Sequence, residues 1–319
     1  MFATFIHAPG NGTSPPLIIT GSDDKTAIIW NLHTGERVRR LEGGHTKTIT
    51  SIGVYTPVNL SSLSLVVTAS KDSTAVVWEL NSGKVVHKLK GGHGVHEISS
   101  VVVYSPAIAS VPPLIVTGGW DHHGVVWDLI TGQQMYRLEE GHKRGITSMA
   151  LYTPLDGTPP MVITGGADEL CVVWNLTNGQ VVRKLEGAHT DRIFSVTVHA
   201  PEGGTCPVLV ITGGEDRIAV VWDLQSGSVL SKLEGGHSGT ISGIAVYSPP
   251  DGVSSPLVLT AGEDKVAVVW DLVTGTQVRR LTGCHTASLH AAAVYAPRGG
   301  RGSPLFITGA QDRTAVIWD

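Results

Sequence analysis

The chain repeats one sequence pattern seven times at a spacing of about 48 residues. Each copy contains a Trp, an Asp six residues before that Trp, and a Thr four residues before that Asp. The tryptophans of the pattern are Trp30, Trp78, Trp127, Trp174, Trp222, Trp270 and Trp318. A period of this length indicates stacked supersecondary units, because one such unit cannot bury its apolar faces alone. We therefore expect residues 1–319 to form a single domain of seven repeats.

Each copy also contains four short runs of β-favouring residues. In the second copy they are residues 49–55, 65–68, 75–78 and 84–89, separated by turns rich in Gly, Pro and Ser. Such a series predicts an antiparallel meander of four strands. The second and third runs are almost continuously apolar, which indicates strands covered on both faces. Seven stacked sheets of this kind predict an all-β fold, a seven-bladed β-propeller.

A Gly-His pair, or a near variant of it, precedes six of the copies. These histidines are His45, His93, His142, His189, His237 and His285, and Ala188 and Cys284 replace the usual Gly in two of the pairs. Gly-His, then Asp, then Trp-Asp, Trp-Asn or Trp-Glu in one repeat resembles the WD40 family. The resemblance covers essentially the whole chain. It implies a propeller whose docking surface is the face that carries the Gly-His loops and the Asp turns.

The resemblance also implies a hydrogen-bonded chain of His, Thr, Asp and Trp in each repeat. A buried Asp needs several donors, which imidazole, hydroxyl and indole groups can supply or relay. A satisfied network of this kind rigidifies each blade. The first copy has Thr20, Asp24 and Trp30 but no His. The implied sets are His45/Thr68/Asp72/Trp78, His93/Thr117/Asp121/Trp127, His142/Thr164/Asp168/Trp174, His189/Thr212/Asp216/Trp222, His237/Thr260/Asp264/Trp270 and His285/Thr308/Asp312/Trp318.

A Thr–His–Asp grouping also suggests nucleophilic catalysis. Six copies cannot all be active sites, and a catalytic triad needs an exposed nucleophile beside an oxyanion hole. Here each Thr lies inside an apolar run, so we expect a structural role and no catalytic residue. The adjacent His122 and His123 point apart in a turn, and Asp121 belongs to the network, so no metal site is expected. No Gly-rich phosphate loop is present, so no cofactor is expected.

The order of the strands along the chain predicts an incomplete last blade. The chain begins at a first strand and stops after a third strand, so that 27 strands are expected. The last blade would then have three strands and an exposed edge, which is a surface for pairing with a partner. A fragment of a longer protein would give the same pattern, and the sequence leaves both explanations open.

Residues that differ among the copies are the candidates for partner binding. Trp120 lies just before its repeated Asp and is the only Trp outside the repeat pattern. An exposed aromatic in a turn is a typical interface anchor, although Trp120 could instead cover a neighbouring loop. Arg192, Phe194 and His290 replace mostly small residues near the starts of first strands. The remaining candidates also stand just before a repeated Asp: Lys71, Glu215 and Glu263.

The charge distribution favours a protein or peptide partner. The net charge is −4 and no Lys/Arg stripe is present, so nucleic-acid binding is not expected. Arg39, Arg40 and their counterparts are interpreted as surface charges of fourth strands, without a lipid-binding signature. No leader or membrane-spanning segment is expected, which favours the cytoplasm, with the nucleus as an alternative.

The leading hypothesis is a non-catalytic interaction scaffold. One alternative is a recognition or sensor module of a larger signalling or regulatory protein. The other is an enzyme that uses the central channel of a propeller. A longer gene product would favour the sensor module, and bound metal or hydrolase activity would favour the enzyme.

Overall fold

The computed structural model describes residues 3–7, 15–57, 63–106, 111–154, 156–201, 207–249, 254–296 and 304–319. These residues form 27 strands and no helix. The strands make seven antiparallel sheets, of which six have four strands and the last has three, β25-β26-β27. The all-β, seven-bladed β-propeller fold class and the three-stranded last blade are thus confirmed. The sheets are called blades 1 to 7 in chain order.

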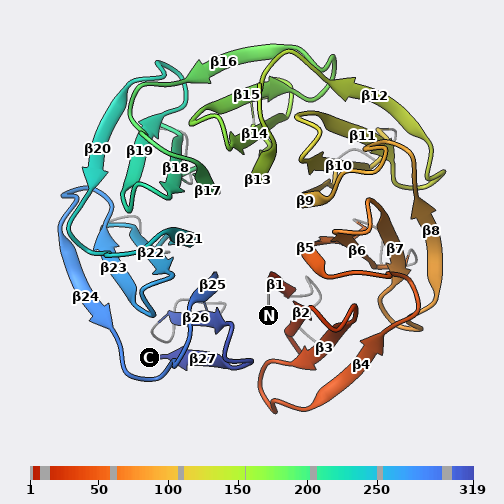
Figure 1. Cartoon of the computed structure of the whole chain (residues 1–319), viewed down its shortest axis with the longest axis horizontal. Coiled ribbons are helices and arrows are strands. Elements are labelled where there is room, and N and C mark those ends of the chain that lie inside the picture. The colour runs from red at the N-terminus through yellow and green to blue at the C-terminus, as the bar shows by residue number, and fades with distance from the viewer. Residues whose placement is uncertain are drawn as a thin grey trace. The chain divides into compact units, whose positions relative to one another are not determined.

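The chain divides into two compact units, Met1–Ile146 and Thr147–Asp319. The prediction of a single domain stays a prediction. The first unit holds blade 1, β1(Ala3–His7) β2(Leu17–Gly21) β3(Ala27–Asn31) β4(Arg37–Leu41), blade 2, β5(Ile49–Tyr55) β6(Leu65–Ser70) β7(Ala75–Glu79) β8(Val85–Leu89), and blade 3, β9(Ile98–Tyr104) β10(Leu114–Gly119) β11(Gly124–Asp128) β12(Gln134–Leu138) (Figure 1).

The second unit holds four blades, and its first strand starts at the last residue of the first unit. They are blade 4, β13(Ile146–Tyr152) β14(Met161–Gly166) β15(Cys171–Asn175) β16(Val181–Leu185), blade 5, β17(Ile193–His199) β18(Leu209–Gly214) β19(Ala219–Asp223) β20(Val229–Leu233), blade 6, β21(Ile241–Tyr247) β22(Leu257–Gly262) β23(Ala267–Asp271) β24(Gln277–Leu281), and blade 7, β25(Leu289–Tyr295) β26(Leu305–Ala310) β27(Ala315–Trp318).

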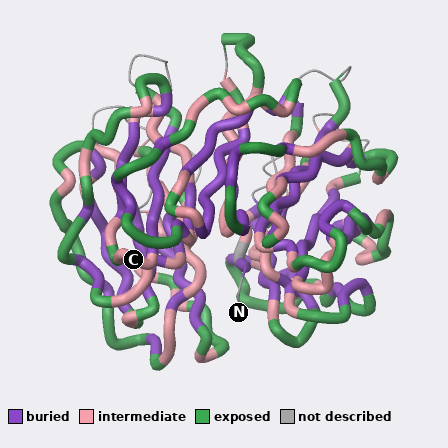
Figure 2. The backbone as a smooth tube through the Cα atoms, turned by 45° about the horizontal axis from the view of Figure 1, so that its top comes forward, coloured by how far each residue is buried: buried purple, intermediate pink, exposed green. Residues whose placement is uncertain are grey.

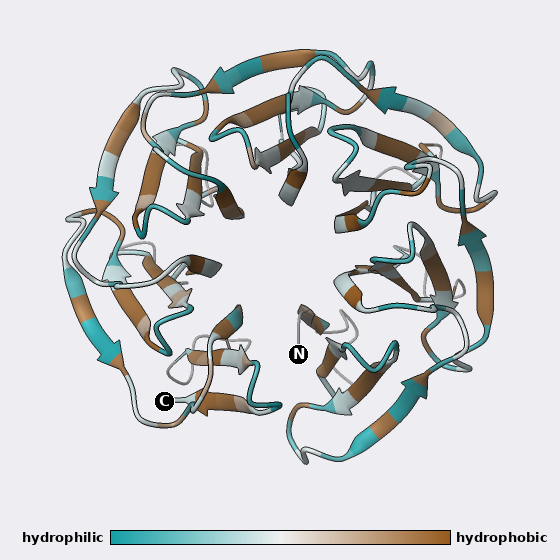
Figure 3. Cartoon of the chain, viewed as in Figure 1, coloured by the Kyte–Doolittle hydropathy of each residue, from teal (hydrophilic) through white to brown (hydrophobic). Residues whose placement is uncertain are grey.

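Burial in each blade follows the hydrophobic pattern of its strands. The second strands are almost wholly buried, and all six residues of β6 are buried. The purple segments of Figure 2 show the buried parts of the blades. The fourth strands are mostly exposed except for their last Leu, and Figure 3 shows that they mix polar and apolar residues. Strands that are apolar on both faces need cover on both faces, and the neighbouring blades provide that cover.

The repeated Trp joins neighbouring blades. In the first unit, the Trp78 side chain of blade 2 packs into one cluster with Ile19 and Ile29 of blade 1. In the second unit, Trp270 of blade 6 packs with Ile211 and Val221 of blade 5. Buried rings of this size dominate the energetics of a core, so these contacts hold adjacent sheets face to face.

Two β-bulges recur in the blades and aim particular side chains. The first lies between the third and fourth strands, where Val221 pairs with Ser231 but Trp222 pairs with Val229, so that Leu230 is skipped. A bulged residue is turned out of the ladder, which explains why this position carries an exposed apolar side chain in blades 1 to 6. These residues are Val38, Val86, Met135, Val182, Leu230 and Val278.

The second bulge lies near the start of the first strand. In blade 5, Ile193 pairs with Gly214 and Ser195 pairs with Gly213, so that Phe194 is skipped. The equivalent skipped residues elsewhere include Thr50, Ser99, Ser242 and His290. The bulge therefore aims this side chain away from its own ladder.

Candidate functional site

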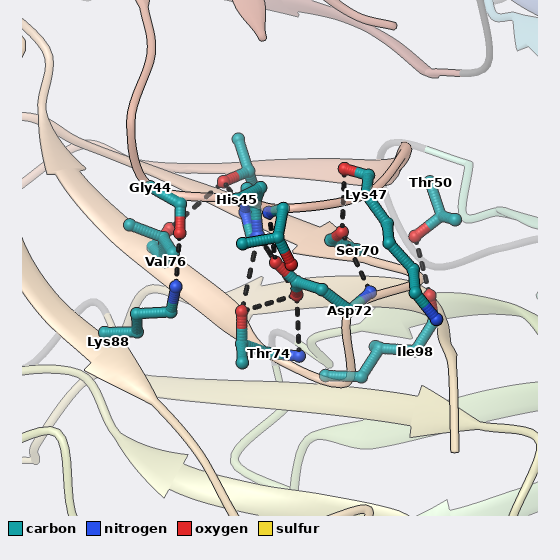
Figure 4. A network of polar contacts seen from close by, with 12 residues as sticks. Gly44, His45, Lys47, Thr50, Ser70, Asp72, Thr74, Val76, Lys88 and Ile98 are labelled. Atoms are coloured by element: carbon teal, nitrogen blue, oxygen red, sulfur yellow. Dashed lines mark hydrogen bonds and ion pairs between the residues drawn. The ribbon is translucent and has the colours of Figure 1, made fainter. Parts of the chain in front are cut away.

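Blade 5 shows the repeated polar network in full. The indole N–H of Trp222 donates to Thr212 Oγ1 at 2.8 Å, and the same oxygen lies 2.7 Å from His189 Nε2. The other imidazole nitrogen, His189 Nδ1, lies 2.8 Å from Asp216 Oδ2. Figure 4 shows the corresponding His45 and Asp72 of blade 2, where the Thr74 hydroxyl also donates to the carboxylate at 2.6 Å.

The direction of donation along this chain follows from the chemistry of its groups. The Asp216 carboxylate accepts only, so the neutral imidazole of His189 carries its proton on Nδ1. Its Nε2 then accepts the Thr212 hydroxyl proton, and that hydroxyl accepts the Trp222 indole proton. Each buried polar atom has a partner, which is the condition for a buried network to stabilise a fold.

The same chain of contacts recurs in the other blades. The His Nδ1–Asp distances are 3.1 Å in blade 2, 2.8 Å in blade 3, 3.2 Å in blade 6 and 3.1 Å in blade 7. The corresponding His Nε2–Thr Oγ1 distances are 2.8, 2.8, 2.8 and 2.9 Å. The structure thus brings together these residues: His45, Thr68, Asp72 and Trp78; His93, Thr117, Asp121 and Trp127; His237, Thr260, Asp264 and Trp270; His285, Thr308, Asp312 and Trp318.

In blades 1 and 4 the hydrogen bond between the repeated Trp and Thr is also present. In blade 1 the Trp30 indole donates to Thr20 Oγ1 at 2.9 Å, and Thr26 and Arg40 contact Asp24. In blade 4 the Trp174 indole donates to Thr164 Oγ1 at 2.8 Å. His142 belongs to the first unit, whereas Thr164 and Asp168 belong to the second. The set built on His142 stays a prediction.

The network carboxyls stay ionised although they are partly buried. Burial alone would raise the pKa of Asp216, but the hydrogen bond from His189 and the N–H of Thr190 outweigh it and hold that pKa below its usual range. The pKa of Asp72, Asp121, Asp264 and Asp312 is lowered in the same way. In blade 6, burial lowers the pKa of His237, and Asp264 only partly counters that effect.

The carboxylate also fixes the loop that carries the His. The backbone N–H after the His donates to the Asp in blades 2, 5, 6 and 7, from Thr46, Thr190, Ser238 and Thr286. Blade 3 departs because its loop has one more residue between His93 and the first strand than the loops of the other blades. Its extra residue makes a turn in which the His96 N–H donates to the His93 carbonyl.

Basic side chains of the fourth strands complete the network, and the sequence interpretation missed them. Lys88 Nζ donates to the Gly44 carbonyl, and Arg280 donates to the Gly236 carbonyl at 2.6 Å. The acceptor is the carbonyl of the residue just before the network His. A signal was present, because every residue ten positions after Trp30, Trp78, Trp127, Trp174, Trp222 and Trp270 is Lys or Arg: Arg40, Lys88, Arg137, Lys184, Lys232 and Arg280.

Two further sets of side chains connect neighbouring blades within each unit. At the fourth strands, Arg39 donates to the Ser82 carbonyl of the next blade, and Arg183 donates to the Ser226 carbonyl. Two features of that turn favour glycine. Gly227 has a φ of +77°, and a Cβ at this position would lie 2.8 Å from Arg183 Cδ. The interpretation of Arg39 and its counterparts as mere surface charges is therefore incomplete.

At the first strands, the bulged hydroxyls donate to the next blade. Thr50 Oγ1 donates to the Ile98 carbonyl at 2.7 Å, and Ser242 Oγ donates to the Leu289 carbonyl at 2.5 Å. The sequence interpretation saw only that these residues are small. Phe194 occupies the same position without a hydroxyl, so it cannot donate to the next blade.

The predicted partner-binding residues lie in both units. In the first, Trp120 is 39% exposed, and Lys71 Nζ lies 3.9 Å from Glu97 Oε2. In the second, Arg192 Nε lies 3.7 Å from Glu215 Oε2, and Glu263 is exposed.

Two of the predicted partner-binding residues are half-buried. Phe194 and His290 lie on the first-strand bulges of blades 5 and 7. Among the described residues no group of three or more His, Cys, Asp or Glu side chains could hold a metal ion. The described part of the chain also has no helix that is long and apolar enough to cross a membrane.

Comparison with protein families identifies the repeat. Four segments match the family described as WD domain, G-beta repeat, at residues 35–79, 132–175, 179–223 and 227–271, which together make up more than half of the chain. The chain belongs to the WD40 family. WD40 propellers typically bind proteins or peptides and are generally non-catalytic. No curated protein matches the chain.

Proposed function

We propose that this WD40 protein is a non-catalytic scaffold that presents rigid blade faces to protein or peptide partners. The observation that supports the proposal is that the repeated polar residues already make hydrogen bonds to one another. In blade 5 the Thr212 hydroxyl is buried, and it already bonds to both His189 and Trp222. A nucleophile must be accessible to its substrate, so this hydroxyl supports a structural role.

The variable residues support an interaction role in turn. The networks hold the loops and turns of blades 2, 3, 5, 6 and 7, and the residue just before the repeated Asp varies among the copies. Exposed residues of varied chemistry on a rigid support suit specific recognition of a folded or peptide partner. The charges of these turns are mixed, which favours a protein over a nucleic acid.

The proposal extends to where the protein acts. The proposal places the protein in the cytoplasm and gives it protein or peptide partners, not nucleic acid or a membrane. It includes contact with a partner through the edge of β27. In the described structure β27 pairs with β26 alone. An unpaired edge can accept a partner strand, and a peptide with β-favouring residues would be the fitting ligand.

A pull-down tests the proposal. The wild-type chain and a Trp120→Ala/Phe194→Ala variant are immobilised and exposed to lysate of the source cells. We expect the wild type to retain specific proteins that the variant loses. Equal capture by both would refute the assignment of these residues. No specific capture, together with hydrolase activity in a substrate screen, would refute the scaffold.

A further inference from the structure

The departures of blade 3 from the repeat lie together at one place in the first unit. Its loop after His93 has an inserted residue, its turn carries Trp120, and His122 and His123 follow Asp121. The Trp120 N–H donates to the Glu97 carbonyl at 3.0 Å, which joins the turn to the inserted loop. We call the surface of Val95, His96, Trp120, His122 and Arg144 the blade 3 corner.

Two large apolar side chains are exposed at this corner. Val95 is 88% exposed, the highest value among the exposed large apolar residues of the described chain, and Trp120 is 39% exposed. The Trp120 ring rests on the backbone of the loop before β13, since a Cβ on Gly145 would lie 2.6 Å from the ring. The ring is therefore held on one side and open on the other. Rigid aromatic anchors of this kind dominate binding energies at interfaces.

The exposed charges around the corner are mainly positive. Lys47 and Lys71 lie on the adjoining loop and turn of blade 2, and Arg144 lies next to Gly145. The Glu97 carboxylate lies 3.9 Å from Lys71 Nζ, whereas neither Lys47 nor Arg144 forms an ion pair with an acidic side chain of the described residues. In the second unit, Arg192 pairs with Glu215 at 3.7 Å, and Glu263 lies two residues from Lys265. A positive site on a chain of net charge −4 favours a negatively charged ligand.

We propose that the blade 3 corner binds an acidic peptide segment that places one apolar side chain on Trp120 and Val95. This inference rests on the proposed scaffold function and names its partner class. An apolar anchor accounts for the two exposed apolar residues, and flanking carboxylates account for Lys47, Lys71 and Arg144. A nucleic acid would also stack on Trp120, but it would need a longer basic track than these loops supply.

Selection from a random dodecapeptide library on the immobilised full chain tests this inference. We expect the enriched peptides to combine Asp or Glu with one Phe, Trp, Leu or Ile. Affinity for the best peptide, measured by fluorescence anisotropy, should fall about tenfold or more in Trp120→Ala and Arg144→Glu, and should fall as salt is raised. Trp120→Phe should retain most of the affinity. Gln311→Ala, at the equivalent turn position of blade 7, is the matched control and should bind like the wild type.

Other outcomes overturn the inference and separate it from the scaffold function. Enriched peptides that are basic, or that bind Trp120→Ala as tightly as the wild type, would show that the corner is not the site. Binding lost only in Gln311→Ala would place the peptide site in the second unit and leave the scaffold function standing. If a labelled single-stranded RNA binds more tightly than any selected peptide, the ligand is a nucleic acid and the inference is wrong. A selection that enriches no peptide also contradicts the proposed peptide site. The lysate pull-down tests the scaffold function independently.

Discussion

The hydroxyl at the centre of the blade 5 network provides the sharpest test of the structure. Thr212→Val keeps the volume and the β-branched shape of the side chain but removes the hydroxyl. The Trp222 indole N–H and His189 Nε2 then lose their 2.8 Å and 2.7 Å partners in a buried site. Leaving one buried polar atom without a partner costs about 1–3 kcal/mol, so two should cost about 2–6 kcal/mol.

The measurement is urea unfolding of the whole chain, followed by tryptophan fluorescence and by circular dichroism. A loss of about 3 kcal/mol is a large share of the roughly 5–15 kcal/mol that holds a typical domain folded. Hydrogen exchange read by mass spectrometry should show the loss of protection in peptides of β18 and β19 first. Local opening of that blade would be the direct sign that the network holds it.

Two controls separate the hydroxyl from other effects. Thr212→Ser keeps the hydroxyl and should cost only about 1 kcal/mol for the lost methyl group. Thr190→Val changes an exposed Thr whose backbone N–H, not its hydroxyl, bonds Asp216, and should change stability by less than about 0.5 kcal/mol. If Thr212→Val unfolds at the same urea concentration as Thr190→Val, the network does not stabilise the blade and our reasoning fails.

Three further predictions follow from single contacts. Burial lowers the pKa of His199, so the unfolded chain binds a proton more readily than the folded chain, and stability is lost as pH falls below the ordinary pKa of 6.5. Blades 2, 3, 4, 6 and 7 have Tyr at the equivalent position. We therefore expect His199→Tyr to reduce the change of melting temperature between about pH 7 and pH 5. Arg280→Met removes the donor to the Gly236 carbonyl and should lower the free energy of unfolding by about 1 kcal/mol, whereas a change below about 0.3 kcal/mol would show that the contact is idle. Lys265 has a φ of +68°, so Lys265→Gly should raise the free energy of unfolding in urea by about 0.5 kcal/mol, and Lys265→Val should lower it.

The repeat made the fold and the network residues predictable from the sequence. A strand that is apolar on both faces, a Trp at a fixed spacing and a turn Gly each specify local structure, and seven copies reinforce every assignment. The three strands of the last blade followed from counting the runs. The position of Thr212 beside Trp222 also follows from the sequence. Thr212 pairs with Val220 in the ladder, and Trp222, two residues further along, lies on the same face as its diagonal neighbour.

The side-chain contacts to backbone carbonyls, within and between blades, were not predictable to the same degree. Lys88 and Arg280 recur at one spacing from the Trp, but their acceptors are backbone carbonyls, which have no sequence signature. The hydroxyls of Thr50 and Ser242 looked like small residues because nothing in the sequence reveals the bulge that aims them at the next blade. Phe194 therefore seemed comparable to Trp120 as a candidate for partner binding.

The structure separates these two residues by what each replaces. At the position of Phe194, most other copies have a hydroxyl that joins two blades, so a change there alters an internal contact of the fold. The counterparts of Trp120 include Lys71, Glu215 and Glu263, which differ from an indole in charge and size. The side chain at this position can contact the residue just before the next first strand, as Lys71 contacts Glu97 and Trp120 contacts Gly145. A position that accepts Lys, Glu or Trp is only weakly constrained by folding. The Trp120 ring covers Gly145 on one side, and its exposed side gains nothing from water. The proposed acidic peptide accounts for that exposed side, which is why the blade 3 corner, and not the bulge of β17, is the place to look for the partner.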